Sequence, residues 1–431
     1  MNDTPPWVEP DTVAGLHLPP TFVADHAVRA LAYQGAMTPP EIARHWHVED
    51  AIAIEVVASL KAAGLIELDS AHVTFERGRV HLTPAGHERV AAARRRTWFA
   101  GALPVSLDDF AQRIDLARPP PSLVARVGDA IRTLAIAPAL ADEIGQAINA
   151  GATLALHGAA FDEQTTIAGM LGLALGGDVS LPFALYAAGA VVRLFDPRYH
   201  RASETRRRDE ETTDVSLRSR ESHARWATVR RPVVMLSGGV QLTDVLPAYD
   251  DDARFYVAPA PLAACHGLLA VLDSDAHPAA LAELARLWLI PGRHHTGVLL
   301  LRSGERIEIP WRASTLLFGE VARALPSALR RAAVYNIDIS ELATDALSAF
   351  LTARFEANAY PPEAVEAIAA LLECRDLATR VAAASACQYL RDRSAYEGGA
   401  RSLTPAAFED AVRFAADARG QGRPPELRAA S

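Results

Sequence analysis

The first hundred residues show three stretches with helical spacing of apolar positions, followed by one in which apolar and polar positions alternate. Residues 20–35 have helical periodicity and close at a glycine. Thr38 is a suitable N-cap for a second helix because prolines follow it, and residues 49–64 predict a third helix. Residues 72–86 alternate like a β-hairpin. Three helices and a hairpin predict a winged helix-turn-helix domain over residues 20–97.

The pattern changes after this unit. The proline-rich stretch ARPPPS predicts a stiff linker over residues 98–135. Apolar runs then alternate with helical stretches through residues 136–335, which predicts a three-layer α/β core. Its candidate strands are ATLALHG, AVVRLFD, PVVMLSGG, GLLAVLD and STLLFG. Ala-rich amphipathic helices predict a helical lid over residues 336–418, and the tail at 419–431 is expected to be disordered.

Composition and charge narrow the class of protein. The chain has 431 residues and a formal net charge of -9, which argues against a protein whose main task is to coat nucleic acid. Its cysteines, Cys265, Cys374 and Cys387, fit no zinc spacing, and their odd count suits a reducing compartment. No signal peptide is visible, and no stretch nears the ~20 apolar residues of a membrane span. We therefore expect a cytoplasmic protein without a membrane partner.

The third predicted helix is acidic. It offers Glu49, Asp50 and Glu55 against a single lysine, Lys61. Modules that read DNA place this helix in the major groove, where acidic side chains repel phosphate. Contact with a protein is therefore favoured over DNA binding, which stays open as the weaker alternative.

The stretch LALHGAAFDEQTTIAGML has the layout of a phosphate-binding loop between a strand and a helix. A P-loop follows G-x-x-x-x-G-K-[ST], because backbone N–H groups and a lysine surround the phosphates. Gly158 supplies the first glycine, but Glu163 replaces the second and Gln164 replaces the lysine, before Thr165 and Thr166 follow in register. A carboxylate of the loop and a phosphate ~4–5 Å apart would repel each other by roughly 3–4 kcal/mol at an effective dielectric near 20. We therefore expect no binding of ATP and Mg²⁺, or weak binding.

Further segments surround this loop in the sequence. They are ALGGDVSLPFALYAAGAVVRLFDPRYHR, RRPVVMLSGGVQLTDVLPAYDDDARFYVAPAPLAACHGLLAVLD, LARLWLIPGR, ALRRAAVYNIDI and CRDLATRVA, of which RLFDPRYH and FYVAP are the more specific. Together with the loop, they resemble the bacterial AAA+ ATPases that carry an N-terminal winged-helix-like segment. The resemblance covers about residues 20–415 and implies an AAA+-like P-loop core with a C-terminal helical lid.

The resemblance also implies roles for single residues. Asp273 corresponds to the Walker B carboxylate that holds Mg²⁺, and Ser274 replaces the acid that activates water. Arg330 or Arg331 corresponds to the arginine finger that acts across a subunit interface, and Arg375 corresponds to the sensor arginine of the lid. The family's sensor asparagine is absent from LLFGEVARA. On the alternative interpretation, the aspartate caps a turn and the arginines are ordinary surface ion-pair partners.

The groups nearest the expected γ-phosphate are thus altered, whereas the arginines that face neighbouring subunits are kept. This pattern predicts a degenerate, non-catalytic AAA+-like protein that serves as a regulatory or scaffolding subunit. Its partner would be a second copy, an active paralogue or another protein. The alternative is an active, chaperone-like ATPase that remodels a protein partner, and a DNA-binding regulator is the weaker third possibility.

Overall fold

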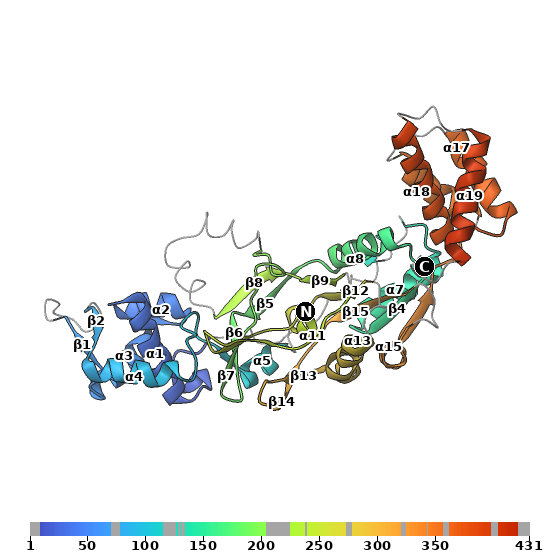
Figure 1. Ribbon diagram of the computed structural model, residues 1–431. Helices are drawn as coiled ribbons and strands as arrows, with labels where there is room; N and C mark the ends of the chain where they lie inside the picture. Colours follow the sequence, from blue (N-terminus) through green and yellow to red (C-terminus); the bar gives the residue numbers. More distant parts are fainter. Residues whose placement is uncertain are drawn as a thin grey trace, which may run out of the picture.

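The computed structural model of the protein has three connected parts (Figure 1). A helical unit with a two-stranded sheet lies at the N-terminal end, an α/β body lies in the middle, and a bundle of helices lies at the C-terminal end. The described residues are 9–69, 78–114, 126–127, 130, 134–203, 225–237, 239–272, 278–319, 325–342, 344–356, 362–397 and 404–420.

The N-terminal unit combines helices with a pair of short strands. Its elements are η1 (Ala14–Leu16), α1 (Pro20–Gln34), α2 (Pro39–Trp46), α3 (Asp50–Ala62), β1 (Ile66–Leu68), β2 (Val80–Leu82) and α4 (Pro84–Arg94). The two strands pair antiparallel. Thr38 caps α2 as predicted, and the Glu41 carboxylate accepts the Thr38 N–H at 2.8 Å. The fully buried Trp46 lies in the core between these elements.

A parallel five-stranded sheet forms the centre of the α/β body. Across the sheet, its strands are β16 (Tyr335–Asp338), β4 (Thr153–His157), β15 (Ser314–Gly319), β12 (Leu268–Val271) and β9 (Val233–Leu236). In chain order they are the fifth, first, fourth, third and second strands, and every neighbouring pair is parallel. The carboxyl end of β4 therefore lies between those of β15 and β16.

Four of the five strands predicted for the α/β core belong to this sheet. The remaining one, AVVRLFD, forms β7 (Ala190–Arg193) in another sheet, and β16 completes the parallel sheet instead. β16 was not anticipated because its sequence, YNID, has a single buried position at the edge of the sheet. The inner strands are buried on both faces and read as continuous apolar runs, which the sequence signals more clearly.

Helices cover both faces of the parallel sheet. On one face, α7 (Pro138–Asn149) and α8 (Phe161–Leu175) share a hydrophobic cluster with the strands. The other face carries α11 (Leu242–Val245), α12 (Ala260–Ala263), α13 (Pro278–Leu284), the π-helix Ala285–Leu289 and α15 (Ser327–Ala332). The short α14 (Ile290–Gly292) continues the π-helix. The body is therefore a three-layer α/β structure.

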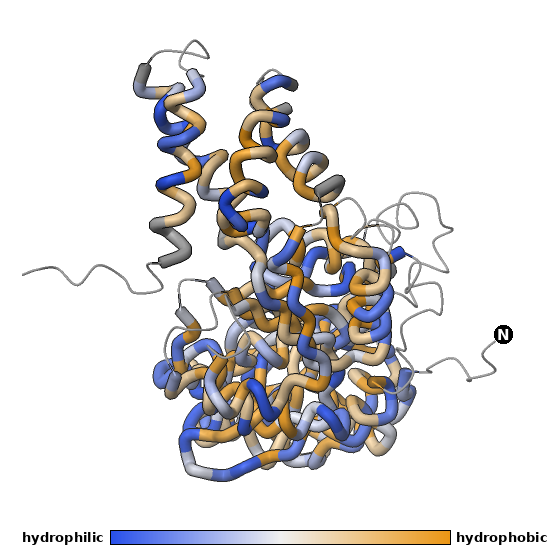
Figure 2. Tube along the Cα trace, turned by 90° about the vertical axis from the view of Figure 1, so that its right-hand side faces the viewer, coloured by the Kyte–Doolittle hydropathy of each residue, from blue (hydrophilic) through white to orange (hydrophobic). Residues whose placement is uncertain are grey.

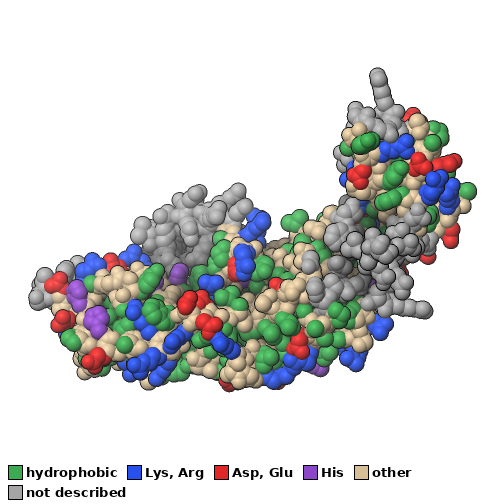
Figure 3. Space-filling model, in the orientation of Figure 1, with side chains coloured by type: hydrophobic (Ala, Val, Ile, Leu, Met, Phe, Trp, Pro, Cys, Tyr) green, Lys and Arg blue, Asp and Glu red, His purple; other side chains and the backbone are tan. Residues whose placement is uncertain are grey.

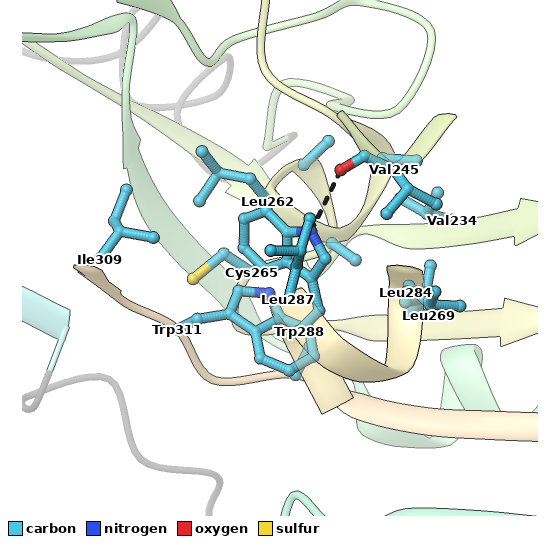
Figure 4. Packing of buried hydrophobic residues seen from close by; sticks show 14 of the residues in the cluster. Val234, Val245, Leu262, Cys265, Leu269, Leu284, Leu287, Trp288, Ile309 and Trp311 are labelled. Carbon is cyan, nitrogen blue, oxygen red and sulfur yellow. Dashed lines mark hydrogen bonds between the residues drawn. The ribbon is translucent and has the colours of Figure 1, made fainter. Parts of the chain in front are cut away.

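Two buried tryptophans organise the second of these faces (Figure 4). The indole N–H of Trp288 donates to the carbonyl of Val245 at 3.1 Å, and that of Trp311 donates to the carbonyl of Pro261 at 2.7 Å. Their rings meet edge to face, with centroids 5.6 Å apart. Buried aromatic rings with satisfied N–H groups contribute strongly to a core. The segment LARLWLIPGR therefore has a structural role here.

A second five-stranded sheet connects the N-terminal unit to the body. Its strands, in order, are β10 (Ala248–Asp250), β11 (Phe255–Val257), β7, β6 (Ala184–Ala187) and β3 (Val105–Ser106). Ala184 and Val191 pack into the core of the N-terminal unit, whereas Leu185 and Val192 pack into the core of the body. Two antiparallel pairs complete the body, β5 (Asp178–Pro182) with β8 (Trp226–Arg230) and β13 (Thr296–Leu300) with β14 (Arg306–Pro310).

Part of the segment expected to be a linker, residues 98–135, is folded core. It contains β3 and α5 (Leu107–Ile114), and the fully buried ring of Phe110 stacks 6.2 Å from that of Trp226. The expectation gave weight to the prolines of ARPPPS, which lie outside the described residues. It overlooked the amphipathic spacing of LDDFAQRI, whose apolar side chains face the core.

The C-terminal bundle contains α16 (Thr344–Glu356), α17 (Pro362–Cys374), α18 (Arg380–Glu397) and α19 (Pro405–Gly420), with a hydrophobic core of its own. Figure 2 shows the bundle standing clear of the body and joined to it at one end. Ala160, just before α8, belongs to the bundle's cluster, so the two parts meet at the start of α8. Residues 421–431 of the tail lie outside the described residues. No described helix is long and apolar enough to span a membrane.

Candidate functional site

The candidate phosphate site lies where β4 runs into α8. All residues of β4 are buried, and Gly158 follows it with a φ of 82°, in the left-handed region that favours glycine. A side chain at Gly158 is also excluded by packing, because its Cβ would lie 2.6 Å from the backbone nitrogen of Ser340. The chain therefore turns sharply at Gly158 and is held against the segment that follows β16.

The helix α8 begins soon after this turn. Ala160 is the N-cap residue, and Phe161 is the first helical residue. The backbone N–H groups of Glu163 and Gln164 donate to the Ala160 carbonyl at 2.9 and 3.2 Å. In a P-loop, backbone N–H groups of this region surround the phosphates instead. Here these N–H groups form the hydrogen bonds of the first helical turn, so the wide loop that the motif needs is not formed.

The carboxylate of Glu163 caps the start of α8 from within the chain. Its Oε2 accepts the Ala160 N–H at 3.1 Å, and the residue is buried. Glu163 is the third residue of the helix, where the helix dipole favours a negative charge. An anionic oxygen of the protein thus sits at the helix N-terminus, where helices of this kind bind a phosphate.

Arg380, the first residue of α18, reaches this carboxylate from the C-terminal bundle. Its Nη1 lies 3.0 Å from Oε1 of Glu163, and its side chain is buried. Its Nε donates to the carbonyl of Ile339 at 2.9 Å. Its Nη2 donates to the carbonyls of Leu134 and Ala135 at 2.7 and 2.6 Å. The guanidinium therefore ties four separate segments together at the start of α8.

Burial governs the electrostatics of this pair. Burial lowers the pKa of Arg380, and the carboxylate of Glu163 opposes that shift. A buried charge that loses its partner costs about 3–5 kcal/mol, so the two side chains are expected to act as one unit. A phosphate entering here would have to displace a carboxylate that is already bonded or lie beside its negative charge. Both outcomes disfavour nucleotide binding.

The other residues of the degenerate motif lie further along α8. Gln164 is buried, whereas Thr165 and Thr166 are exposed on the second turn of the helix. In a P-loop, the hydroxyl at the end of the motif binds Mg²⁺ beside the phosphates. Here both threonines are exposed and follow the buried Glu163 and Gln164 along the helix.

The expected Walker B residues, Asp273 and Ser274, lie outside the described residues, as does the segment 320–324 after β15. The strands that precede them in the chain, β12 and β15, run parallel to β4 and end at the same edge of the sheet. Within the described part of the chain, no three His, Cys, Asp or Glu side chains form a group that could hold a metal ion.

The arginines expected to act at subunit contacts and in the lid are exposed. Arg330 and Arg331 lie on α15, and Arg375 follows α17. The arginine of the C-terminal bundle that contacts the start of α8 is instead Arg380, for which the sequence resemblance implies no role. The sequence feature that could have pointed to Arg380 is its position in the first turn of a helix, where the helix dipole disfavours a cation unless an acceptor is close.

No protein-family model and no curated protein matches the chain.

Proposed function

We propose that the protein is a cytoplasmic, non-catalytic AAA+-like subunit with a regulatory or scaffolding role, whose nucleotide place is filled by its own side chains. The parallel five-stranded sheet with helices on both faces is compatible with a P-loop-like core. The helices and hairpin of the N-terminal unit support a winged helix, and the C-terminal bundle supports a lid.

The observation that carries the proposal is the position of the Glu163 carboxylate. It lies at the N-terminus of α8, bonded to the Ala160 N–H and to Arg380. In a P-loop protein, the anion at such a helix N-terminus comes from the ligand. Here it comes from the chain, so the C-terminal bundle is held against α8 without a nucleotide.

A protein whose C-terminal bundle is held against α8 without a nucleotide is suited to binding other proteins rather than to hydrolysing ATP. Its exposed Arg330 and Arg331 on α15 would be offered to a neighbouring subunit, either a second copy or an active paralogue. The acidic start of α3, with Asp50 exposed, favours a protein partner over DNA for the N-terminal unit.

Equilibrium binding of a fluorescent ATP analogue with Mg²⁺ tests the proposal. The wild type should not bind. The double variant Glu163→Gly/Gln164→Lys should bind, because it empties the helix N-terminus, adds a cation and leaves Arg380 for the phosphate. The matched control is Gln164→Lys alone, which adds the same charge but keeps the carboxylate in place and should stay silent.

Binding by the wild type at micromolar concentration, competed by unlabelled ATP, would overturn the proposal. The active, partner-remodelling ATPase would then be the better account, and hydrolysis would be the next measurement.

A further inference from the structure

A groove beside the outer strand β9 carries concentrated positive charge. It has a volume of about 760 Å³, and its lining includes Arg198, Arg201, Arg230, Arg231 and one carboxylate, that of Asp178. The formal net charge of the whole chain is -9. The groove therefore departs in sign from the rest of the protein. In Figure 3, basic side chains lie over the end of β8, on the side of the body that holds α8.

Two of these arginines have no carboxylate partner among the described residues. Arg201 is exposed, and Arg231 is half-buried with its Nη1 donating to the carbonyl of His266 at 2.7 Å. Burial and the neighbouring Arg126 lower the pKa of Arg231. Arg198, in contrast, forms an ion pair with Asp196. Of the groove's cations, Arg201 and Arg231 thus lie there without a matching carboxylate from the part of the chain that is described.

The floor of the groove is apolar. Val233 and Met235 line it from β9, and Gly169 and Gly172 line it from the second half of α8. A Cβ at Gly172 would lie 3.1 Å from a methyl carbon of Val233, so the helix approaches the strand closely there. Leu173 lies at the rim with 81% of its surface exposed. This floor suits apolar side chains rather than water alone.

The strand β9 is the last strand of its sheet, and no described strand pairs with its outer edge along this groove. It pairs with β12, where the carbonyls of Pro232 and Leu236 accept hydrogen bonds. The alternation of a parallel ladder therefore turns the N–H and C=O groups of Val233 and Met235 to the other side. No hydrogen bond from a described residue reaches those groups. An unpaired strand edge is a template for an added strand.

We propose that this groove binds an extended acidic segment of a partner protein, which pairs with β9 as an added strand and places its carboxylates on the arginines. The strand edge supplies backbone hydrogen bonds, the floor takes alternate apolar side chains, and the arginines select acidic residues. A nucleic acid cannot use the strand edge in this way, because it has no peptide backbone to pair with β9. A second copy is disfavoured because it would bring the two sets of arginines together.

The inference deepens the proposed function by giving the chemistry of one partner of the regulatory subunit. It concerns the second half of α8, away from Glu163, and its test measures peptide binding rather than nucleotide binding. The failure of one proposal is therefore distinguishable from the failure of the other.

Fluorescence anisotropy with synthetic peptides tests the inference on the full chain. The probes are labelled peptides in which Glu alternates with Val, Leu or Phe, and the controls are the same peptides with Lys for Glu. At least one acidic peptide should bind with a dissociation constant on the order of 10–100 μM, the range of transient contacts of small area. The Lys peptides should not bind. N-methylation of the acidic peptide at alternate residues should abolish binding, because it removes the donors of the added strand.

Variants locate the peptide on the protein. Arg201→Glu should weaken binding by about tenfold, since one charge reversal in such a contact is worth about 1.4 kcal/mol. The matched control is Arg306→Glu on β14, an exposed arginine outside the groove, which should bind as the wild type does. Circular dichroism on both variants shows that each remains folded.

Three results would overturn the inference. One is that no acidic peptide binds, in which case the arginines only protect the strand edge from aggregation. Another is that Arg201→Glu and Arg306→Glu weaken binding equally. The third is that a single-stranded oligonucleotide binds in an Arg201-dependent manner while the peptides do not.

Discussion

The charged side chains at the start of α8 and those beside its second half are arranged in different ways. At its start, the chain provides both charges, and the Glu163 carboxylate and the Arg380 guanidinium satisfy each other in a buried site. Beside its second half, Arg201 and Arg231 have no carboxylate partner among the described residues, and no described strand pairs with the outer edge of β9. The paired charges at the start of α8 stabilise the fold, whereas we propose that the two arginines of the groove are available to a partner.

The largest expected effect comes from breaking the closed site. Arg380→Met leaves the Glu163 carboxylate and three carbonyl groups without their donor, so the free energy of unfolding should fall by about 3–5 kcal/mol. Urea unfolding measures this change. The matched control is Arg286→Met, which removes an exposed ion pair with Glu283 and should cost less than about 1 kcal/mol. Equal losses in the two variants would show that the buried pair has no special role.

A smaller effect should follow from a methyl group at the turn after β4. Gly158→Ala must adopt a φ of 82° and also meets the backbone of Ser340, so a loss of about 2–3 kcal/mol is expected. The control lies at the other end of β4, where Gly151 also has positive φ but nothing within 4 Å of the added Cβ. Gly151→Ala should cost only about 1–2 kcal/mol. The same loss at both glycines would mean that the contact with Ser340 does not hold the turn.

Acid should lower the free energy of unfolding through His266, whose carbonyl accepts a hydrogen bond from Arg231 of the groove. Burial lowers the pKa of His266 to about 3, well below its ordinary value of 6.5. As the pH falls below 6.5, the unfolded chain takes up a proton that the folded chain does not, so stability decreases. From pH 7 to pH 5 this residue should account for about 2 kcal/mol.

His266→Asn isolates this contribution, because asparagine tolerates the left-handed backbone at this position, where φ is 64°. Urea unfolding of both proteins at pH 7 and pH 5 should give a shallower pH dependence for the variant. The variant curve should not be flat, because burial also lowers the pKa of His26, His157 and His200. Parallel curves for the two proteins would contradict the assignment to His266.

The sequence predicts much of this picture but not the pairing that closes the site. The buried strands of the parallel sheet are recognisable in the sequence as apolar runs. Glu163 in place of the second P-loop glycine already indicates that the loop does not bind phosphate as a P-loop does. The early start of α8 was not predicted, because the motif's register suggested a longer loop. It follows from Glu163 acting as an internal cap.

The partner of Glu163 could not be derived from local pattern. Arg380 lies more than two hundred residues away in the chain and meets the carboxylate only because the C-terminal bundle packs against the start of α8. Neighbouring Arg375 was the more natural choice by resemblance, yet it is exposed. The groove was missed for the same reason, since its arginines come from separate segments that the fold brings together.

The most direct test of the central claim is amide hydrogen exchange over residues 154–171, measured by mass spectrometry with and without saturating ATP and Mg²⁺. The account predicts identical exchange under both conditions, because the Glu163 carboxylate already holds the start of α8. It also predicts faster exchange in this segment for Glu163→Gln, whose uncharged side chain leaves Arg380 without a counter-charge. Slower exchange of the wild type on addition of nucleotide would contradict the account.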